Sequence, residues 1–226
     1  MRREIVLDTE TTGLDPKNGD RVVEIGCVEL SNFVPTGKTF HSYVNPQRAM
    51  HPDATAISGL TEEFLKDFPL FEEVAADFLA FIGEAPLVIH NAPFDIKFLN
   101  AELKRLDLPL LAMERAVDTL PLARRLFPGA PASLDALCRR FNVDNSRRTL
   151  HGALLDCELL AEVYVHLMGG KQARLTLEQN PEQVRVGTTK TKDYPLRTFA
   201  PSQEERAAHE AFCLGIKNPL WEEIPH

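Results

Sequence analysis

The spacing of apolar residues changes once along this chain, and that change limits its fold more than any other feature. Near the N-terminus the apolar residues form short runs and alternations, which predict strands. After about residue 70 they recur every three or four positions, which predicts helices with two short strands between them. Strands are expected at 4–10, 21–30, 38–45, 87–89 and 116–119. Helices are expected at 71–82, 94–106, 120–126, 134–141 and 152–168. The first three strands follow one another and favour an antiparallel meander, so we expect a chain of the α/β class.

The residue composition changes after Gly169 and Gly170, which are typical of the end of a helix. Residues 171–195 are polar and predict a flexible linker. A short helix is expected at 203–212, and it is too short to be stable unless it docks on something. The sequence therefore predicts three parts, 1–170, 171–195 and 196–226.

Net charge, apolar runs and cysteine spacing indicate which partners and which cellular compartment the protein can have. The chain has 226 residues and a formal net charge of −8, all of which falls in residues 1–170 because the two signs balance in the remainder. A protein that grips DNA by neutralising phosphates is expected to be basic, so either this chain does not bind nucleic acid or a partner supplies most of the grip. No apolar run approaches a membrane span, and the four cysteines are not spaced as a metal knuckle or redox pair. We expect a cytoplasmic protein.

Two acids stand at the end of the first predicted strand. Asp8 and Glu10 are two residues apart, so they face the same side of a strand. Carboxylates held together beside an apolar run repel one another unless a cation lies between them. Taken alone, two hydrated acids at a strand end would be the simpler interpretation.

Two further acids lie where a site can form. Asp95 begins a helix directly after the strand at 87–89, although an acid there can simply complement the helix dipole. Asp156 lies among apolar residues in a helix and needs a partner, for which an arginine is an alternative to a metal. His151 is about 140° around an ideal helix from Asp156, so we expect it in a loop or first turn that reaches the site. By itself it could equally be a surface histidine.

Together these residues form four carboxylates and one histidine that a sheet could bring to one point. Four negative charges match two divalent cations, and oxygen ligands suit Mg²⁺ or Mn²⁺. Two such ions about 3.5–4 Å apart can hold the attacking and leaving oxygens of a phosphodiester. A histidine is a suitable base for the attacking water.

Three motifs carry a resemblance to a known family. Residues 6–13 (Val-Leu-Asp-Thr-Glu-Thr-Thr-Gly), 90–95 (His-Asn-Ala-Pro-Phe-Asp) and 151–156 (His-Gly-Ala-Leu-Leu-Asp) resemble, in order and spacing, the motifs of DEDDh 3′→5′ exonucleases. The resemblance covers residues 4–170. It implies a ribonuclease H-like fold, a mixed five-stranded sheet flanked by helices. Stretches at 133–138 and 144–156 are similar to the epsilon-type proofreading subunits of bacterial replicative polymerases.

The resemblance implies roles for particular residues. Asp8, Glu10, Asp95 and Asp156 would be metal ligands and His151 the general base. Thr11, Gly13 and Ile57 would lie beside the terminal nucleotide. Asp118 matches a family acid near the site and would have a supporting role there. Ser58 stands where relatives often carry a histidine beside the substrate, which puts the grip on the nucleotide at that point in question.

The tail also resembles that of epsilon-type subunits. Residues matching the segment that holds the polymerase catalytic (alpha) subunit are Ala207, Ala208, Leu220 and Trp221. Residues matching a short sliding-clamp motif, a pattern easily produced by chance, are Gln172, Leu175 and Leu177. The implied partners are a DNA 3′ terminus, the polymerase subunit, and with less support a clamp and a small theta-like accessory subunit.

Other functions stay open at this point. An exonuclease of the same family that trims RNA would carry the same catalytic motifs, but would not need residues 171–226. A polymerase adaptor without activity would need the tail and not the acids. A phosphatase would use Asp8 in a nucleophile loop, but such loops usually have Asp rather than Glu10 as the second acid.

Overall fold

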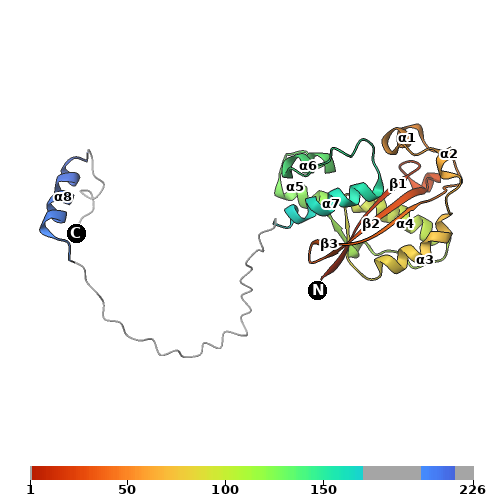
Figure 1. Ribbon diagram of the computed structural model, residues 1–226, viewed down its shortest axis with the longest axis horizontal. Helices are drawn as coiled ribbons and strands as arrows, with labels where there is room; N and C mark the ends of the chain where they lie inside the picture. The colour runs from red at the N-terminus through yellow and green to blue at the C-terminus, as the bar shows by residue number, and fades with distance from the viewer. Residues whose placement is uncertain (1, 170–199, 217–226) are drawn as a thin grey trace, which may run out of the picture. The chain divides into compact units, whose positions relative to one another are not determined.

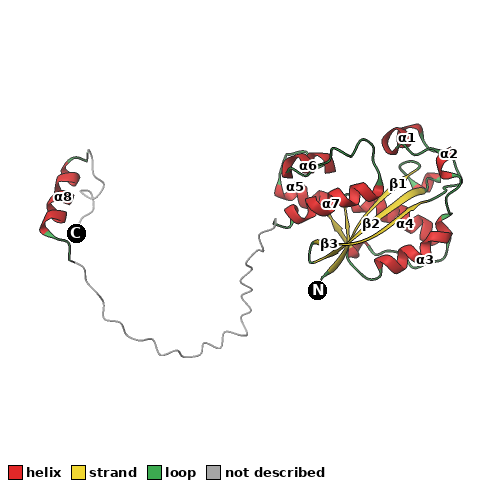
Figure 2. Cartoon of the chain, in the orientation of Figure 1, coloured by secondary structure: helices red, strands yellow, loops and turns green. Residues whose placement is uncertain are grey.

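The computed structural model describes residues 2–169 and 200–216. The chain divides into two units, Met1–Leu175 and Thr176–His226. The predicted linker at 171–195 lies outside the described residues. Figure 1 labels the helices and the strands β1, β2 and β3, and Figure 2 colours the elements by type.

The first unit is built on one five-stranded sheet in the order β3-β2-β1-β4-β5. The strands are β1 (Arg3–Thr11), β2 (Val22–Ser31), β3 (Val34–Tyr43), β4 (Leu87–Ile89) and β5 (Ala116–Asp118). β1, β2 and β3 are antiparallel, while β4 runs parallel to β1 and β5 parallel to β4. The mixed sheet and the antiparallel meander are therefore confirmed.

The start of β3 was predicted wrongly. It begins at Val34 instead of residue 38, because β2 and β3 are joined by a tight turn at Asn32 and Phe33, both with positive φ. Pro35 and Gly37 lie in this first stretch of the strand and conceal its alternation in the sequence. Both residues are tolerated because β3 lies at the edge of the sheet.

The helices of the first unit follow the predicted periodicity closely. They are α1 (Pro52–Ser58), α2 (Glu62–Leu65), α3 (Phe71–Ile82), α4 (Ala92–Arg105), α5 (Thr119–Leu126), α6 (Leu134–Phe141) and α7 (Ala153–Leu167), with 3-10 turns η1 (Pro16–Asn18) and η2 (Met113–Arg115). The short helices α1 and α2 were not predicted, since two turns or fewer carry no reliable apolar period. In the described part of the chain, no helix has the length and apolar content needed to cross a membrane.

The sheet separates two apolar layers, and β1 contributes to both. Ile5 and Leu7 pack in the layer that contains α3 and α4, whereas Val6 packs in the layer that contains α6 and α7. Alternate side chains of a strand point to opposite faces. The side chains that continue β1 beyond Leu7 are thus directed alternately toward the two helical layers.

The second unit contains α8 (Gln203–Leu214), which extends the predicted helix by two residues. Ser202 and Glu205 form a capping box at its N-terminus. Phe212 and Leu214 are 70% and 89% exposed. Among the described residues of this unit, nothing covers the apolar side chains of α8.

A glycine in β2 allows the start of α7 to approach the sheet closely. A Cβ atom on Gly26 would lie 2.4–2.5 Å from backbone atoms of Ala153 and Leu154. The carbonyl of Gly26 also accepts a hydrogen bond from the Cys157 thiol at 3.1 Å. Gly26 pairs with Asp8 across β1 and β2, so this contact fixes α7 beside that acid.

Gly26→Ala is expected to force the first turn of α7 away from the sheet and to lower the free energy of unfolding by about 1–3 kcal/mol, the usual effect of overpacking. Gly152→Ala is the matched control, because a Cβ at Gly152 meets no atom within 4 Å. Urea denaturation of both variants measures the difference. Equal stability of the two would contradict the close contact.

Candidate active site

The side chains of Asp8 and Glu10 lie on the same face of β1 as the buried side chain of Val6. Because the three residues alternate along one strand, their side chains lie on the α7 side of the sheet. Both acids are only partly exposed. The same-face arrangement predicted for the pair is confirmed.

Asp95 reaches β1 from the other layer. It lies in the first turn of α4, which follows β4 through Asn91 in the left-handed conformation. The carboxylate is 3% exposed, and its Oδ1 accepts hydrogen bonds from the Thr9 amide at 3.0 Å and the Thr9 hydroxyl at 2.7 Å. Thr9 stands between Asp8 and Glu10, so Asp95 is fixed next to both.

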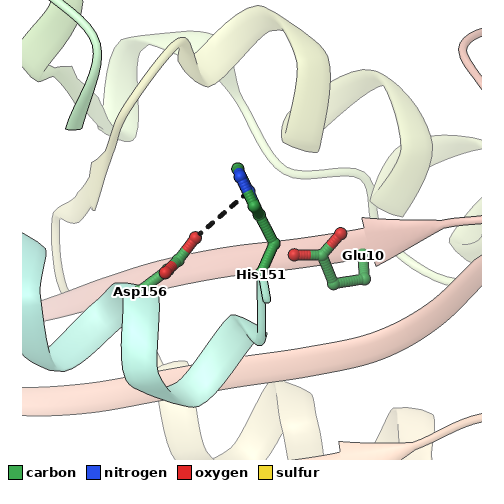
Figure 3. A group of neighbouring side chains, drawn as sticks. All are labelled: Glu10, His151 and Asp156. Atoms are coloured by element: carbon green, nitrogen blue, oxygen red, sulfur yellow. Dashed lines mark ion pairs between the residues drawn. The ribbon is translucent and has the colours of Figure 1, made fainter. Parts of the chain in front are cut away.

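Asp156 and His151 come from the start of α7 and the loop before it. One ligand atom each from Glu10, His151 and Asp156 lie within 4.8 Å of one another, and Figure 3 shows the three side chains converging. His151 precedes the helix and is about half exposed, as the helical geometry predicted. Its amide donates to the Ile57 carbonyl at 3.0 Å, which ties this loop to α1.

Arg148 is a site residue that the sequence analysis missed. Its Nε and Nη2 donate to the two carboxylate oxygens of Asp156 at 2.5 and 2.6 Å, and its Nη1 donates to Asp135 at 2.9 Å. The side chain is 6% exposed. An arginine partner was one interpretation of Asp156, but Arg148 lies in an irregular loop, where no sequence period could assign the pair.

Crowding of the acids changes their protonation. Burial, followed by the charge of Asp156, raises the pKa of Glu10 to about 8. Burial also raises the pKa of Asp95 to about 7, although the Thr9 hydrogen bonds oppose the shift. Burial and the charge of Asp95 raise the pKa of Asp8 well above its usual range. Burial lowers the pKa of His151, so the imidazole is neutral near pH 7.

These groups fit a hard divalent cation. Within residues 2–169 and 200–216, no hydrogen-bond donor reaches the carboxylates of Asp8 or Glu10, and their oxygens are free to bind an ion. The carboxylate oxygens of Asp8, Glu10, Asp95 and Asp156 are the kind of donor that Mg²⁺ and Mn²⁺ prefer. A cation would favour the ionised form of these buried carboxylates, which burial disfavours.

Two hollows adjoin the acids. One, of about 710 Å³, is lined by Glu10 together with the expected substrate residues Thr11, Gly13 and Ile57. The other, of about 590 Å³, is lined by Asp8 and by five polar or basic residues that sequence analysis did not single out: His90, Asn91, Arg124, Ser133 and Arg148. Glu10 therefore lines one hollow, and Asp8 and Asp156 line the other.

Asp118 and Ser58 have structural contacts. The Asp118 carboxylate accepts from the amides of Leu120 and Asn91, each at 3.0 Å, and so caps α5 and holds the turn before Asp95. The Ser58 hydroxyl donates to the Ala54 carbonyl at 2.9 Å and is buried at the end of α1. Ser58 therefore offers no side chain to the hollow, which its neighbour Ile57 lines.

The remaining expected residues belong to the tail. Ala207 and Ala208 are exposed on α8. The others lie outside the described residues: Gln172, Leu175, Leu177, Leu220 and Trp221.

The chain is similar to known exonucleases and to subunits of a DNA polymerase. A family model described as "Exonuclease" matches residues 5–164. A protein of Rickettsia felis called DNA polymerase III subunit epsilon is 52% identical over 222 residues, covering 95% of this chain and 96% of its own. One of the same name from Pasteurella multocida is 44% identical over 237 residues, covering 97% and 93%.

A solved structure shares both fold and sequence. Exonuclease X, in complex with 5′ overhanging duplex DNA, is 31% identical, with a TM-score of 0.58 over 74% of this chain and 91% of its own. The family model's match to residues 5–164 contains every acid of the site. The chain thus belongs to the exonuclease family, in its DEDDh form and of the epsilon type.

Proposed function

We propose that this exonuclease removes nucleotides one at a time from the 3′ end of DNA as the proofreading subunit of a replicative polymerase. The observation that carries the proposal is the convergence of Glu10, His151 and Asp156 within 4.8 Å, beside Asp8 and Asp95. The names of the relatives in Rickettsia felis and Pasteurella multocida support the polymerase context.

Asp8, Glu10, Asp95 and Asp156 would hold two divalent cations, Mg²⁺ or Mn²⁺. When bound, the two ions would hold the attacking and leaving oxygens of the phosphodiester. Neutral His151 accepts the proton of the attacking water. The 3′ oxygen leaves, and the product is a nucleoside 5′-monophosphate.

The two hollows would hold the parts of the DNA on either side of the phosphodiester bond that is cut. The hollow with Thr11, Gly13 and Ile57 receives the terminal nucleotide, and half-exposed Ile57 offers an apolar surface to its base. The hollow with Asn91 and Arg124 receives the strand that remains. A frayed end enters more easily than a paired end, because its bases are already unstacked.

A partner would compensate for the acidic charge of the chain. On α8, Ala208 and Phe212 are four residues apart and share an exposed face, as do Ala207 and Ala211. We propose that this face, with Leu220 and Trp221, binds the polymerase catalytic subunit. A clamp contact through Gln172, Leu175 and Leu177, and a theta-like subunit, rest on the family resemblance alone.

An RNA-trimming exonuclease and an adaptor without activity are the rival functions. The first predicts faster hydrolysis of RNA than of matched DNA, and the second predicts no hydrolysis. The free carboxylates of Asp8 and Glu10 disfavour the adaptor, because crowding them without a cation has only a cost.

The double variant Asp8→Ala, Glu10→Ala is expected to lose Mg²⁺-dependent hydrolysis of single-stranded DNA and to keep its binding to the polymerase subunit. Release of mononucleotides is measured on DNA and RNA of the same sequence. The wild type should act faster on DNA. A double variant that still degrades DNA would show that the site is assigned wrongly.

Mg²⁺ is expected to raise the melting temperature more at pH 8 than at pH 6. The pKa of Glu10 is about 8 in the folded protein against its usual value of 4.5, so the metal-free fold loses stability as pH rises through that interval. A cation binds the deprotonated carboxylate and restores the loss. In Glu10→Gln the difference between the two pH values should shrink; the same Mg²⁺ effect at both pH values in the wild type would count against the site.

A chain that ends at Gly170 is expected to hydrolyse DNA and to lose the polymerase subunit in a pull-down. In the full-length chain, Phe212→Asp should weaken the pull-down, since it places a charge on the exposed apolar face of α8. Retention of the polymerase by the shortened chain would place the contact elsewhere.

A further inference from the structure

Arg148 occupies the position where a cation would contact Asp156. Its guanidinium binds both oxygens of that carboxylate, at 2.5 and 2.6 Å, in a bidentate pair. The side chains of Arg148 and Asp156 are each only 6% exposed. A buried carboxylate needs a counter-charge, and in this arrangement Arg148 supplies it.

The same guanidinium also engages His151. Its Nη2 lies 2.9 Å from the imidazole Nδ1. A guanidinium has donors only, so Nδ1 is the acceptor and the proton of neutral His151 is on Nε2. The ring then has no free lone pair with which to accept a proton from water. Arg148 thus binds two groups that hydrolysis requires, the carboxylate of Asp156 and the imidazole of His151.

A cation and Arg148 compete for one carboxylate. The ligand atoms of Glu10, His151 and Asp156 are within 4.8 Å of one another, so an ion among them would lie close to the guanidinium. Two positive groups at that separation repel each other. The Asp156 oxygens have few directions left for a metal while both accept from Arg148.

We propose that Arg148 is a place-holding counter-ion for Asp156, which must release that carboxylate before a divalent cation can bind to it. The inference rests on the proposed metal-dependent function. Because Arg148 and His151 belong to one loop, release of the guanidinium also frees Nδ1 of His151. Arg148 is therefore a positioning residue that couples cation binding to the arrangement of the base.

The structure provides a second anchor for Arg148 after release. Its Nη1 donates to Asp135 at 2.9 Å, and Asp135 is 40% exposed on the wall of the hollow beside the acids. The guanidinium can turn from Asp156 while it keeps this contact. Its charge then faces the hollow assigned to the remaining strand, next to Arg124.

The chain offers a matched control at the next position. Arg147 lies in the same loop, is 76% exposed and contacts only Glu158 at 3.6 Å among the described residues. Arg147→Gln removes the same charge without touching Asp156. The comparison of Arg148→Gln with Arg147→Gln separates direct competition from a general change in charge.

The test is Mn²⁺ binding to the full-length chain, measured by calorimetry at pH 7.5 without DNA. Arg148→Gln is expected to bind Mn²⁺ at least about fivefold more tightly than the wild type, the lower end of usual coupling between two ligands. Arg147→Gln should bind as the wild type does. Equal or weaker binding by Arg148→Gln would overturn the inference and make Arg148 a support for the metal ligands.

A second variant keeps the inference testable if Arg148→Gln does not fold. Arg148→Lys keeps the positive charge but cannot hold both oxygens of Asp156 in a bidentate pair, so Mn²⁺ should bind about twofold more tightly than to the wild type, a weaker form of the same coupling. Unchanged or weaker binding by Arg148→Lys would contradict the place-holding role. A wild type that binds no Mn²⁺ would instead overturn the proposed function itself.

Discussion

The mutual repulsion of buried carboxylates is the constraint on which the rest of this structure depends. β1 supplies Asp8 and Glu10, α4 supplies Asp95 and α7 supplies Asp156. Burial raises the pKa of Asp8, Glu10 and Asp95, and the charges of neighbouring site acids raise those of Asp8 and Glu10 further. A fold does not assemble such a group for stability, since removing any one charge would lower the repulsion. The arrangement is therefore explained by what it binds.

The sheet and its two helical layers make the convergence geometrically simple. β1 is central, and its alternation directs Asp8 and Glu10 toward α7 while Thr9 meets Asp95 of α4. Gly26 has no side chain, so α7 can lie close to β2. Thus a backbone contact about three residues before Asp156 sets the distance between the acid of α7 and those of β1.

Much of the fold followed from the sequence because its long elements have strong periods. α3, α6 and β4 have the predicted bounds, since each buries one continuous apolar face or run. The shared face of Asp8 and Glu10 followed from strand alternation, and the loop position of His151 from helical geometry. The full ligand set, by contrast, depended on the family resemblance, because each acid alone has an ordinary structural explanation.

The features that sequence could not predict are those decided by tertiary contacts in irregular segments. Arg148 lies in a loop, so no spacing rule connects it to Asp156. Asp118 matched a family acid, but its helix-capping role becomes visible only once β5 and α5 are placed. Ser58 put the grip on the nucleotide in question, and only the structure shows that its hydroxyl is directed back to the backbone of α1.

The most direct test of the central claim is anomalous diffraction from crystals of the protein grown with Mn²⁺. The account predicts anomalous peaks among the carboxylates of Asp8, Glu10, Asp95 and Asp156, with the Arg148 guanidinium turned away from Asp156. A structure in which Mn²⁺ binds elsewhere, while Arg148 still holds both oxygens of Asp156, would contradict it.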